Sequence, residues 1–134
     1  MVEVTVDDNS QEDIMKIAVS SRGPQLTSEV DPRFGRASYI LIVDSETSEF
    51  EILNNSLNAN AFKGAGIQAA TMVCDKGAKV VMTGYCGPKA FEVLSAADIK
   101  VVNDVSGSVS EAIDRFITGS VKFSAEPNAE AHWS

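Results

Sequence analysis

The sequence predicts a single α/β domain built on a mixed β-sheet. Two observations lead to this class: the first half of the chain holds three closely spaced strand-like runs, and in the second half helical and strand-like patterns alternate. The length of 134 residues, with 44% hydrophobic and 22% charged residues, is typical of one globular domain. The predicted order of elements is β-β-β-α-β-α-β-α.

The first half of the chain predicts three strands. Residues 16–20 (KIAVS), 39–44 (YILIVD) and 50–54 (FEILN) are rich in β-branched, aromatic and other apolar side chains. The second and third runs are separated by the five polar residues 45–49, which is the length of a hairpin loop. We therefore expect these two strands to pair antiparallel.

The second half predicts helices placed between two further strands. Apolar residues recur at helical spacing over 65–76, and a glycine follows at the position that often ends a helix. The short apolar runs 79–83 and 99–103 predict strands. Residues 87–97, which lie between those runs, predict a helix with a proline in its first turn.

A capping motif predicts the last helix. Ser108 and Glu111 form an S-x-x-E pair, apolar residues follow at helical spacing, and Gly119 ends the run. Strands that alternate with helices are joined by right-handed crossovers and therefore run parallel. Together with the hairpin, this pattern predicts a mixed, largely parallel sheet with helices over its faces.

The acidic residues are concentrated at the start of the chain. Residues 1–14 carry five acids and no base, within a formal net charge of −8. We expect 1–14 to be a disordered acidic extension, 15–119 to form the folded domain and 120–134 to be a flexible tail. The negative charge argues against general nucleic-acid binding, which needs a basic surface.

The sequence also indicates where the protein works. No apolar run approaches the roughly 20 residues of a membrane helix, so no membrane association is expected. The start of the chain lacks the basic and apolar regions of a secretory signal. Cys74 and Cys86 form neither a CxxC pair nor a disulfide framework. We therefore expect a soluble, cytoplasmic protein.

Chain direction brings four segments to one edge of the predicted sheet. If the second strand runs against the other four, residues 21–36, 55–64, 84–88 and 104–108 all emerge at the carboxyl edge of the parallel strands. Ligands of open α/β sheets bind at this edge, which we call the rim.

The rim is predicted to bind an anion. It gathers five basic residues and the starts of three helices, where glycines let a ligand approach unpaired amides. Two alternatives stay open: Lys63 and Lys89 could be solvated surface charges, and Arg33 or Arg36 could pair with Glu29 or Asp31. The candidate binding residues are Arg22, Arg33, Phe34, Arg36, Lys63, Gly64, Gly66, Tyr85, Cys86, Gly87, Pro88, Lys89, Ser106 and Gly107.

The sequence gives little support for further chemistry. Cys86 lies in a strand-to-helix turn, where the helix N-terminus would lower its pKa and make it a candidate metal ligand; the alternative is a small half-buried structural residue. Cys74 is predicted to be a core residue. The one histidine, His132, lies in the predicted tail, and the carboxylates near the rim are not paired by spacing. We therefore expect no enzymatic activity.

Three stretches resemble a known family: KIAVSSRG (16–23), VDPRFGRASYILIVD (30–44) and KGAGIQAATMVCDKGAKVVMTGYCGPKAFEVL (63–94). Together they are similar to the dinitrogenase iron-molybdenum cofactor biosynthesis family, the NifX-like domain, over about residues 15–119. Within that family the chain most resembles the small single-domain members, the orange protein group of sulfate-reducing bacteria.

The resemblance implies a fold and a ligand. The fold would be a ribonuclease-H-like three-layer arrangement with a five-stranded mixed sheet, and the role would be to carry or store a molybdenum-containing metal-sulfur cluster without catalysis. For the orange protein group, the implied ligand is a sulfide-bridged molybdenum-copper cluster held non-covalently. Such a polyanion would lie against Arg22, Arg33, Lys63 and Lys89, with Phe34, Tyr85 and Pro88 as apolar contacts.

One departure and two alternatives accompany the resemblance. Nitrogenase-associated members often carry a histidine where this chain has Arg33, which argues against metal ligation from that loop. The family setting also allows an interaction module that serves a P-loop ATPase or a cluster-recipient protein. A nuclease would need acidic metal ligands from the first strand, and residues 16–20 contain none.

Overall fold

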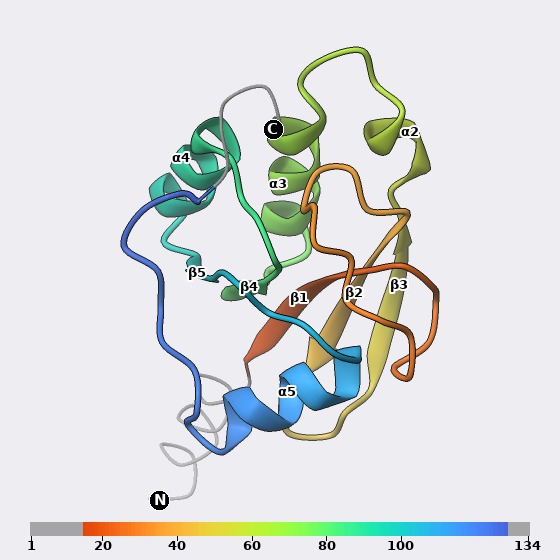
Figure 1. The fold of residues 1–134 in the computed structure, drawn as a ribbon, viewed down its shortest axis with the longest axis vertical. Helices are drawn as coiled ribbons and strands as arrows, with labels where there is room; N and C mark the ends of the chain where they lie inside the picture. The colour runs from red at the N-terminus through yellow and green to blue at the C-terminus, as the bar shows by residue number, and fades with distance from the viewer. Residues whose placement is uncertain (1–14, 129–134) are drawn as a thin grey trace, which may run out of the picture.

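The computed structural model describes residues 15–128, which form a five-stranded sheet between two layers of helices (Figure 1). The prediction of an α/β fold with a mixed sheet is confirmed. The strands are β1 (Lys16–Ser21), β2 (Tyr39–Asp44), β3 (Phe50–Asn54), β4 (Val80–Met82) and β5 (Lys100–Val102).

Strand direction in the sheet is as the sequence predicted. The strand order is β3-β2-β1-β4-β5, so the first strand lies in the middle. β2 pairs antiparallel with both β1 and β3, while β1, β4 and β5 pair parallel. Four strands therefore run the same way, and the loops that follow them emerge at the rim.

The described residues form four helices, one more than predicted. The additional helix is α2 (Ser56–Ala59), a single turn between β3 and α3, so the predicted element order is wrong at that point. None of its four residues is buried, and for that reason it carries no apolar periodicity to reveal it. The other helices are α3 (Ala65–Asp75), α4 (Pro88–Ala96) and α5 (Val109–Ile117).

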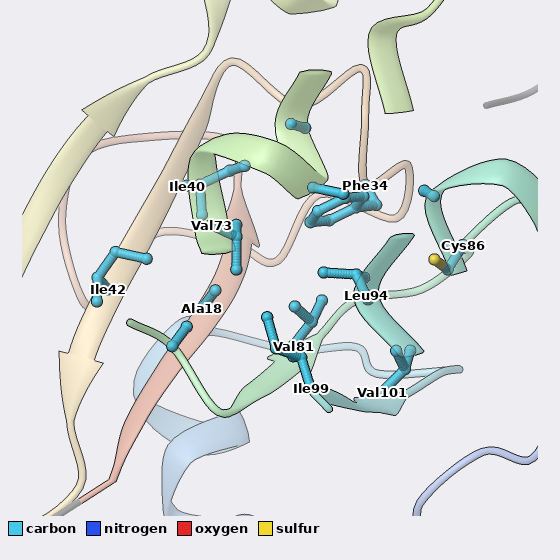
Figure 2. Close-up of a cluster of buried hydrophobic side chains, with 14 of the residues drawn as sticks. Ala18, Phe34, Ile40, Ile42, Val73, Val81, Cys86, Leu94, Ile99 and Val101 are labelled. Atoms are coloured by element: carbon cyan, nitrogen blue, oxygen red, sulfur yellow. The ribbon is translucent and has the colours of Figure 1, made fainter. Parts of the chain in front are cut away.

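Alternating residues of the strands supply two separate cores. Ala18 of β1 and Val81 of β4 face α3 and α4, where they pack with Val73 and Leu94 (Figure 2). Ile17 and its neighbours in the strands face the opposite side and pack with Ala112 and Ile113 of α5. Both faces of the sheet are buried, which explains the nearly continuous apolar runs in the sequence. The helices over each face make three layers.

Residues 120–128, which we call the C-terminal segment, run along the outer side of β5 from the end of α5 toward α4 (Figure 1). The Ser124 amide donates to the Val101 carbonyl at 2.7 Å, and the Asn103 amide donates to Ser124 Oγ at 3.0 Å. The sequence predicted a flexible tail from residue 120; this part of it makes defined contacts. The predicted extension 1–14 and residues 129–134, with His132, lie outside the described residues.

Among residues 15–128, the helices are too short and too polar to cross a bilayer.

Candidate anion-binding site

The loop of residues 22–38 connects the two sides of the rim. Its first half lies against the start of α5, where Glu29 forms a β-bridge with Ser108. Its second half lies against the β4–α4 turn, where Arg33 forms a bridge with Tyr85. The rim therefore has an α5 side and an α3/α4 side, and the predicted residues are divided between them.

Phe34 anchors the loop in the core. Its side chain is 2% exposed and packs in the cluster beneath α3 and α4, near Cys86 (Figure 2). Its amide donates to the Tyr85 carbonyl at 3.2 Å, and the buried Asp31 carboxylate accepts the Arg33 amide at 3.0 Å. The structure gives no support to the prediction of Phe34 as an apolar contact for a ligand, because its ring completes the core.

Two glycines bring backbone segments together at the α3/α4 side. A Cβ on Gly35 would lie 2.6 Å from Gly66 Cα, and one on Gly84 would lie 2.7 Å from Pro32 Cα. Real Cβ atoms do not approach that closely, so only glycine permits this packing. Gly66 is covered by Gly35, and its glycine is explained by packing; as a ligand contact it stays a prediction.

The Arg36 side chain hydrogen-bonds to carbonyls of the next loop rather than to an acidic side chain. Its Nη1 donates to the carbonyls of Ala59 and Ala61, both at 2.8 Å. The side chain therefore pairs with neither Glu29 nor Asp31, and the ion pairs proposed for Arg36 are wrong. It fixes the loop that contains α2 and Lys63.

Three other basic residues lie in segments that meet on the α3/α4 side. Arg33, Lys63 and Lys89 are all exposed. The Nε of Arg33 lies 4.0 Å from Asp31 Oδ1, so the ion pair with Asp31 that was open as an alternative for Arg33 is present. Arg33 is bridged to Tyr85, three residues before α4, while Lys63 precedes α3 by two residues. Arg22 is also exposed, but it lies in the part of the loop that faces α5.

The three helix starts differ in how their amides are used. The N-caps of α3 (Gly64, φ 82°) and α4 (Gly87, followed by Pro88) make no side-chain capping hydrogen bond. At α5, Ser108 and Glu111 form the predicted capping box, which is confirmed. The amides of Val109 and Ser110, the first two residues of α5, donate to the carbonyls of Ser28 and Leu26, both at 2.9 Å. The expectation of unpaired amides at the start of α5 is therefore wrong.

Ser106 and Gly107 serve α5 in this structure. The Ser106 carbonyl accepts a hydrogen bond from Arg115 of that helix. Gly107 has a φ of 90°, which favours glycine, and its carbonyl accepts the Val30 amide at 2.9 Å. Ligand contact by these two residues stays a prediction.

Cys86 lies in the interior rather than on the surface of the turn. Its exposed fraction is 0%, and burial raises the pKa of its thiol to about 12. The predicted lowering of that pKa by the α4 N-terminus is wrong, because desolvation opposes the thiolate. Cys74 is partly buried against the same core, and both cysteines are free thiols. Residues 15–128 contain no group of three or more His, Cys, Asp or Glu side chains that could hold a metal ion.

Sequence reasoning missed Asn128, which lies in the predicted tail. Its Oδ1 accepts the Cys86 amide at 2.9 Å, and its Nδ2 donates to the Gly84 carbonyl at 2.9 Å. Its own amide donates to the Cys86 carbonyl at 3.2 Å. A polar, irregular segment has no local pattern that predicts such long-range contacts, so the sequence contained no signal for them.

A cavity of about 550 Å³ lies apart from the bases of the α3/α4 side, between the loop after β5, Arg115 of α5 and residues 120–125. Lys122 and Phe123 contribute to its walls. The predicted binding residues Arg33, Lys63 and Lys89 are not among those that line it.

The fold and the rim define an α/β protein with a mixed sheet whose glycine-rich, basic edge is built from the loops after four strands. The chain belongs to the dinitrogenase iron-molybdenum cofactor family, whose model matches residues 14–119. This membership confirms the resemblance found in the sequence.

Solved structures show the same relationship. The apo form of the orange protein from Desulfovibrio gigas is 44% identical, with a TM-score of 0.84 over 87% of this chain and 98% of that chain. A putative NifB protein from Thermotoga is 36% identical, with a TM-score of 0.71 over 81% and 92%. A putative dinitrogenase from Methanocaldococcus jannaschii shares the fold at 15% identity, with a TM-score of 0.66 over 85% and 98%. Among curated proteins, none matches the chain.

Proposed function

We propose that this protein binds and carries a metal-sulfur cluster and catalyses no reaction. The observation that carries the proposal is membership of the iron-molybdenum cofactor family, combined with a rim side that has three exposed bases and two helix starts without side-chain caps. Its similarity to the orange protein favours a sulfide-bridged molybdenum-copper cluster as the cargo.

The chemistry of the α3/α4 side suits such a cargo. A thiomolybdate cluster is a polyanion with a sulfur-rich surface. Arg33, Lys63 and Lys89 would compensate its charge, and the N-terminal ends of α3 and α4 add positive dipole ends. Tyr85, which is 39% exposed, and Pro88 would provide apolar contacts. A Cβ on Gly64 would meet only the Gln68 Nε2, at 4.0 Å, so there is room beside the start of α3. Gly87 is buried, and its contact with the cluster stays a prediction.

Holding the cluster without covalent bonds agrees with the state of Cys86. A thiol with a pKa of about 12 is almost entirely protonated at neutral pH, and metals bind the thiolate. We therefore assign Cys86 a packing role and expect a Cys86→Ser variant to retain the cluster. Complete loss of the cluster from that variant would favour direct coordination.

A second candidate role is an interaction module for a P-loop ATPase or a cluster-recipient protein in the cytoplasm. The observation that favours it is the loop held by Arg36, where Leu57 is 90% exposed and Phe62 is 94% exposed. This role is compatible with cluster carriage. We also propose that the fold is ribonuclease-H-like. Nuclease activity is not part of the proposal, because β1, with the sequence KIAVSS, lacks the carboxylates that would bind the catalytic metal ions.

The test is retention of a coloured cluster. Purified protein mixed with copper and tetrathiomolybdate is expected to develop visible charge-transfer bands that remain with it through gel filtration. The double variant Arg33→Glu with Lys89→Glu should lose most of that colour, because two attractive charges on the proposed site become repulsive.

The matched control reverses two lysines at the other edge of the sheet. Lys79 and Lys100 are exposed near the amino ends of β4 and β5, so Lys79→Glu with Lys100→Glu gives the same change in net charge away from the rim. The control should retain colour. Equal retention by the two double variants would contradict the proposed site.

A further inference from the structure

The C-terminal segment ends on the proposed binding site. After Ser124 pairs with β5, the Asn103 Nδ2 donates to the Glu126 carbonyl at 3.4 Å, and the segment then reaches the turn between β4 and α4 (Figure 1). There Asn128 makes its contacts with Gly84 and Cys86. The segment thus links the outer strand to the start of α4.

The Asn128 side chain binds the turn as a neighbouring strand would. A strand offers a carbonyl and an amide from residues that lie two apart, and a paired strand satisfies both. Here the Gly84 carbonyl and the Cys86 amide are those groups, and the Asn128 Nδ2 and Oδ1 satisfy them, each at 2.9 Å. The same Nδ2 lies 3.3 Å from Asp104 Oδ1 in the loop after β5. One side chain therefore connects both neighbouring rim loops.

The turn that Asn128 holds sets the position of the α4 start. Cys86 precedes the N-cap Gly87, and Pro88 has no amide, so the amides that follow, of Lys89 and Ala90, are the first that α4 can offer to an anion. A shift of the Gly84 to Cys86 backbone would move those amides and the Lys89 side chain together.

We propose that Asn128 is a positioning residue of the anion site, which holds the β4–α4 turn in its binding geometry and keeps Cys86 buried; this rests on the proposed function. The rest of the segment is hydrogen-bonded to β5 and to Asn103, away from the β4–α4 turn. Phe123 is 48% exposed, and the Asn103 Oδ1 is buried beneath the segment without a hydrogen-bond partner. Asn128 is the residue of the segment that contacts the turn directly through its side chain.

The experiment combines thiol labelling with cluster retention. In a Cys74→Ser background, where Cys86 is the remaining thiol, Asn128→Ala is compared with the parent well below the melting temperature. The rate at which N-ethylmaleimide labels Cys86 should rise about tenfold, because lost hydrogen bonds let the turn open more often. Retention of the copper-tetrathiomolybdate cluster should fall several-fold.

Ser124→Ala is the matched control within the same segment. It removes the Ser124 Oγ that accepts the Asn103 amide, but it leaves the β4–α4 turn untouched. It should change labelling and retention less than about twofold even if it lowers the melting temperature as much as Asn128→Ala does. Asn128→Asp, which keeps an acceptor for the Cys86 amide but cannot donate to Gly84, should behave like Asn128→Ala.

The outcomes separate this proposal from the one on which it rests. If Asn128→Ala labels faster but retains the cluster fully, Asn128 holds the turn and does not position the site, and the inference is overturned. Unchanged labelling overturns it as well. If the parent retains no cluster, the proposed function fails, and labelling alone then decides whether Asn128 holds the turn.

Discussion

Both sides of the rim contain glycine-containing helix starts, but they differ in whether the amides of those starts are already hydrogen-bonded. On the α5 side, the helix start is capped by Ser108 and Glu111, and the next amides are taken by carbonyls of the loop 22–38. On the α3/α4 side, glycine N-caps leave the helix starts without side-chain caps, and exposed bases lie beside them. A helix N-terminus therefore predicts an anion site only where the protein has not already used its amides.

The largest expected effect comes from Gly35, which joins the loop to α3. Gly35→Ala should lower the free energy of unfolding by about 1–3 kcal/mol and weaken cluster retention, because the new Cβ meets the backbone of Gly66. Denaturant unfolding measures the first effect and gel filtration measures the second.

Gly77→Ala is the control for Gly35→Ala. Gly77 has a φ of 76° and open space around it, so alanine there should cost about 1 kcal/mol of backbone strain and leave retention unchanged. Equal loss of retention in both variants would mean that general stability, not the contact between Gly35 and α3, determines binding.

An intermediate effect should distinguish the bases of the two sides. Lys89→Glu should weaken cluster binding about tenfold, whereas Arg22→Glu should weaken it less than about threefold, because Arg22 lies in the part of the loop that faces α5. Titration of each variant with the preformed cluster at fixed ionic strength measures the ratio. Equal losses would show that the ligand spans both sides.

The smallest effect on binding should follow from the α5 cap. Ser108→Ala removes the side chain that accepts the Glu111 amide, so the free energy of unfolding should fall by about 1 kcal/mol. Cluster retention should stay the same. A clear loss of retention from this variant would break the distinction between the two sides.

The sequence predicted the elements of this molecule that contribute buried apolar residues. The five strands were expected from short, nearly continuous apolar runs, and three of the four described helices from apolar residues at helical spacing, with a capping motif at the last. α2 buries nothing and left no such signal. The direction of β2 followed from a hairpin-length loop, and it correctly brought the rim loops to one edge.

The roles of individual rim residues were harder to predict. Arg36 and Phe34 looked like ligand contacts because composition does not say whether a side chain turns outward or inward; the structure shows one bonded to loop carbonyls and the other in the core. The cap motif at Ser108 predicted the start of α5, but it does not reveal that the loop 22–38 accepts the first two amides of that helix. Asn128 depends on a contact between residues more than forty positions apart, which no local pattern encodes.

The opposite locations of the two ends of the described chain have a practical consequence. The chain enters the sheet at Lys16, at the amino edge of β1, and Asn128 lies at the other edge, on the β4–α4 turn. An affinity tag or a fluorescent fusion joined after residue 134 is thus connected to the fold through Asn128, beside the proposed binding site. The same label attached at the amino-terminal side is connected to the fold through Lys16, at the far edge of the sheet, so amino-terminal labelling is the better choice for purification and surface immobilisation.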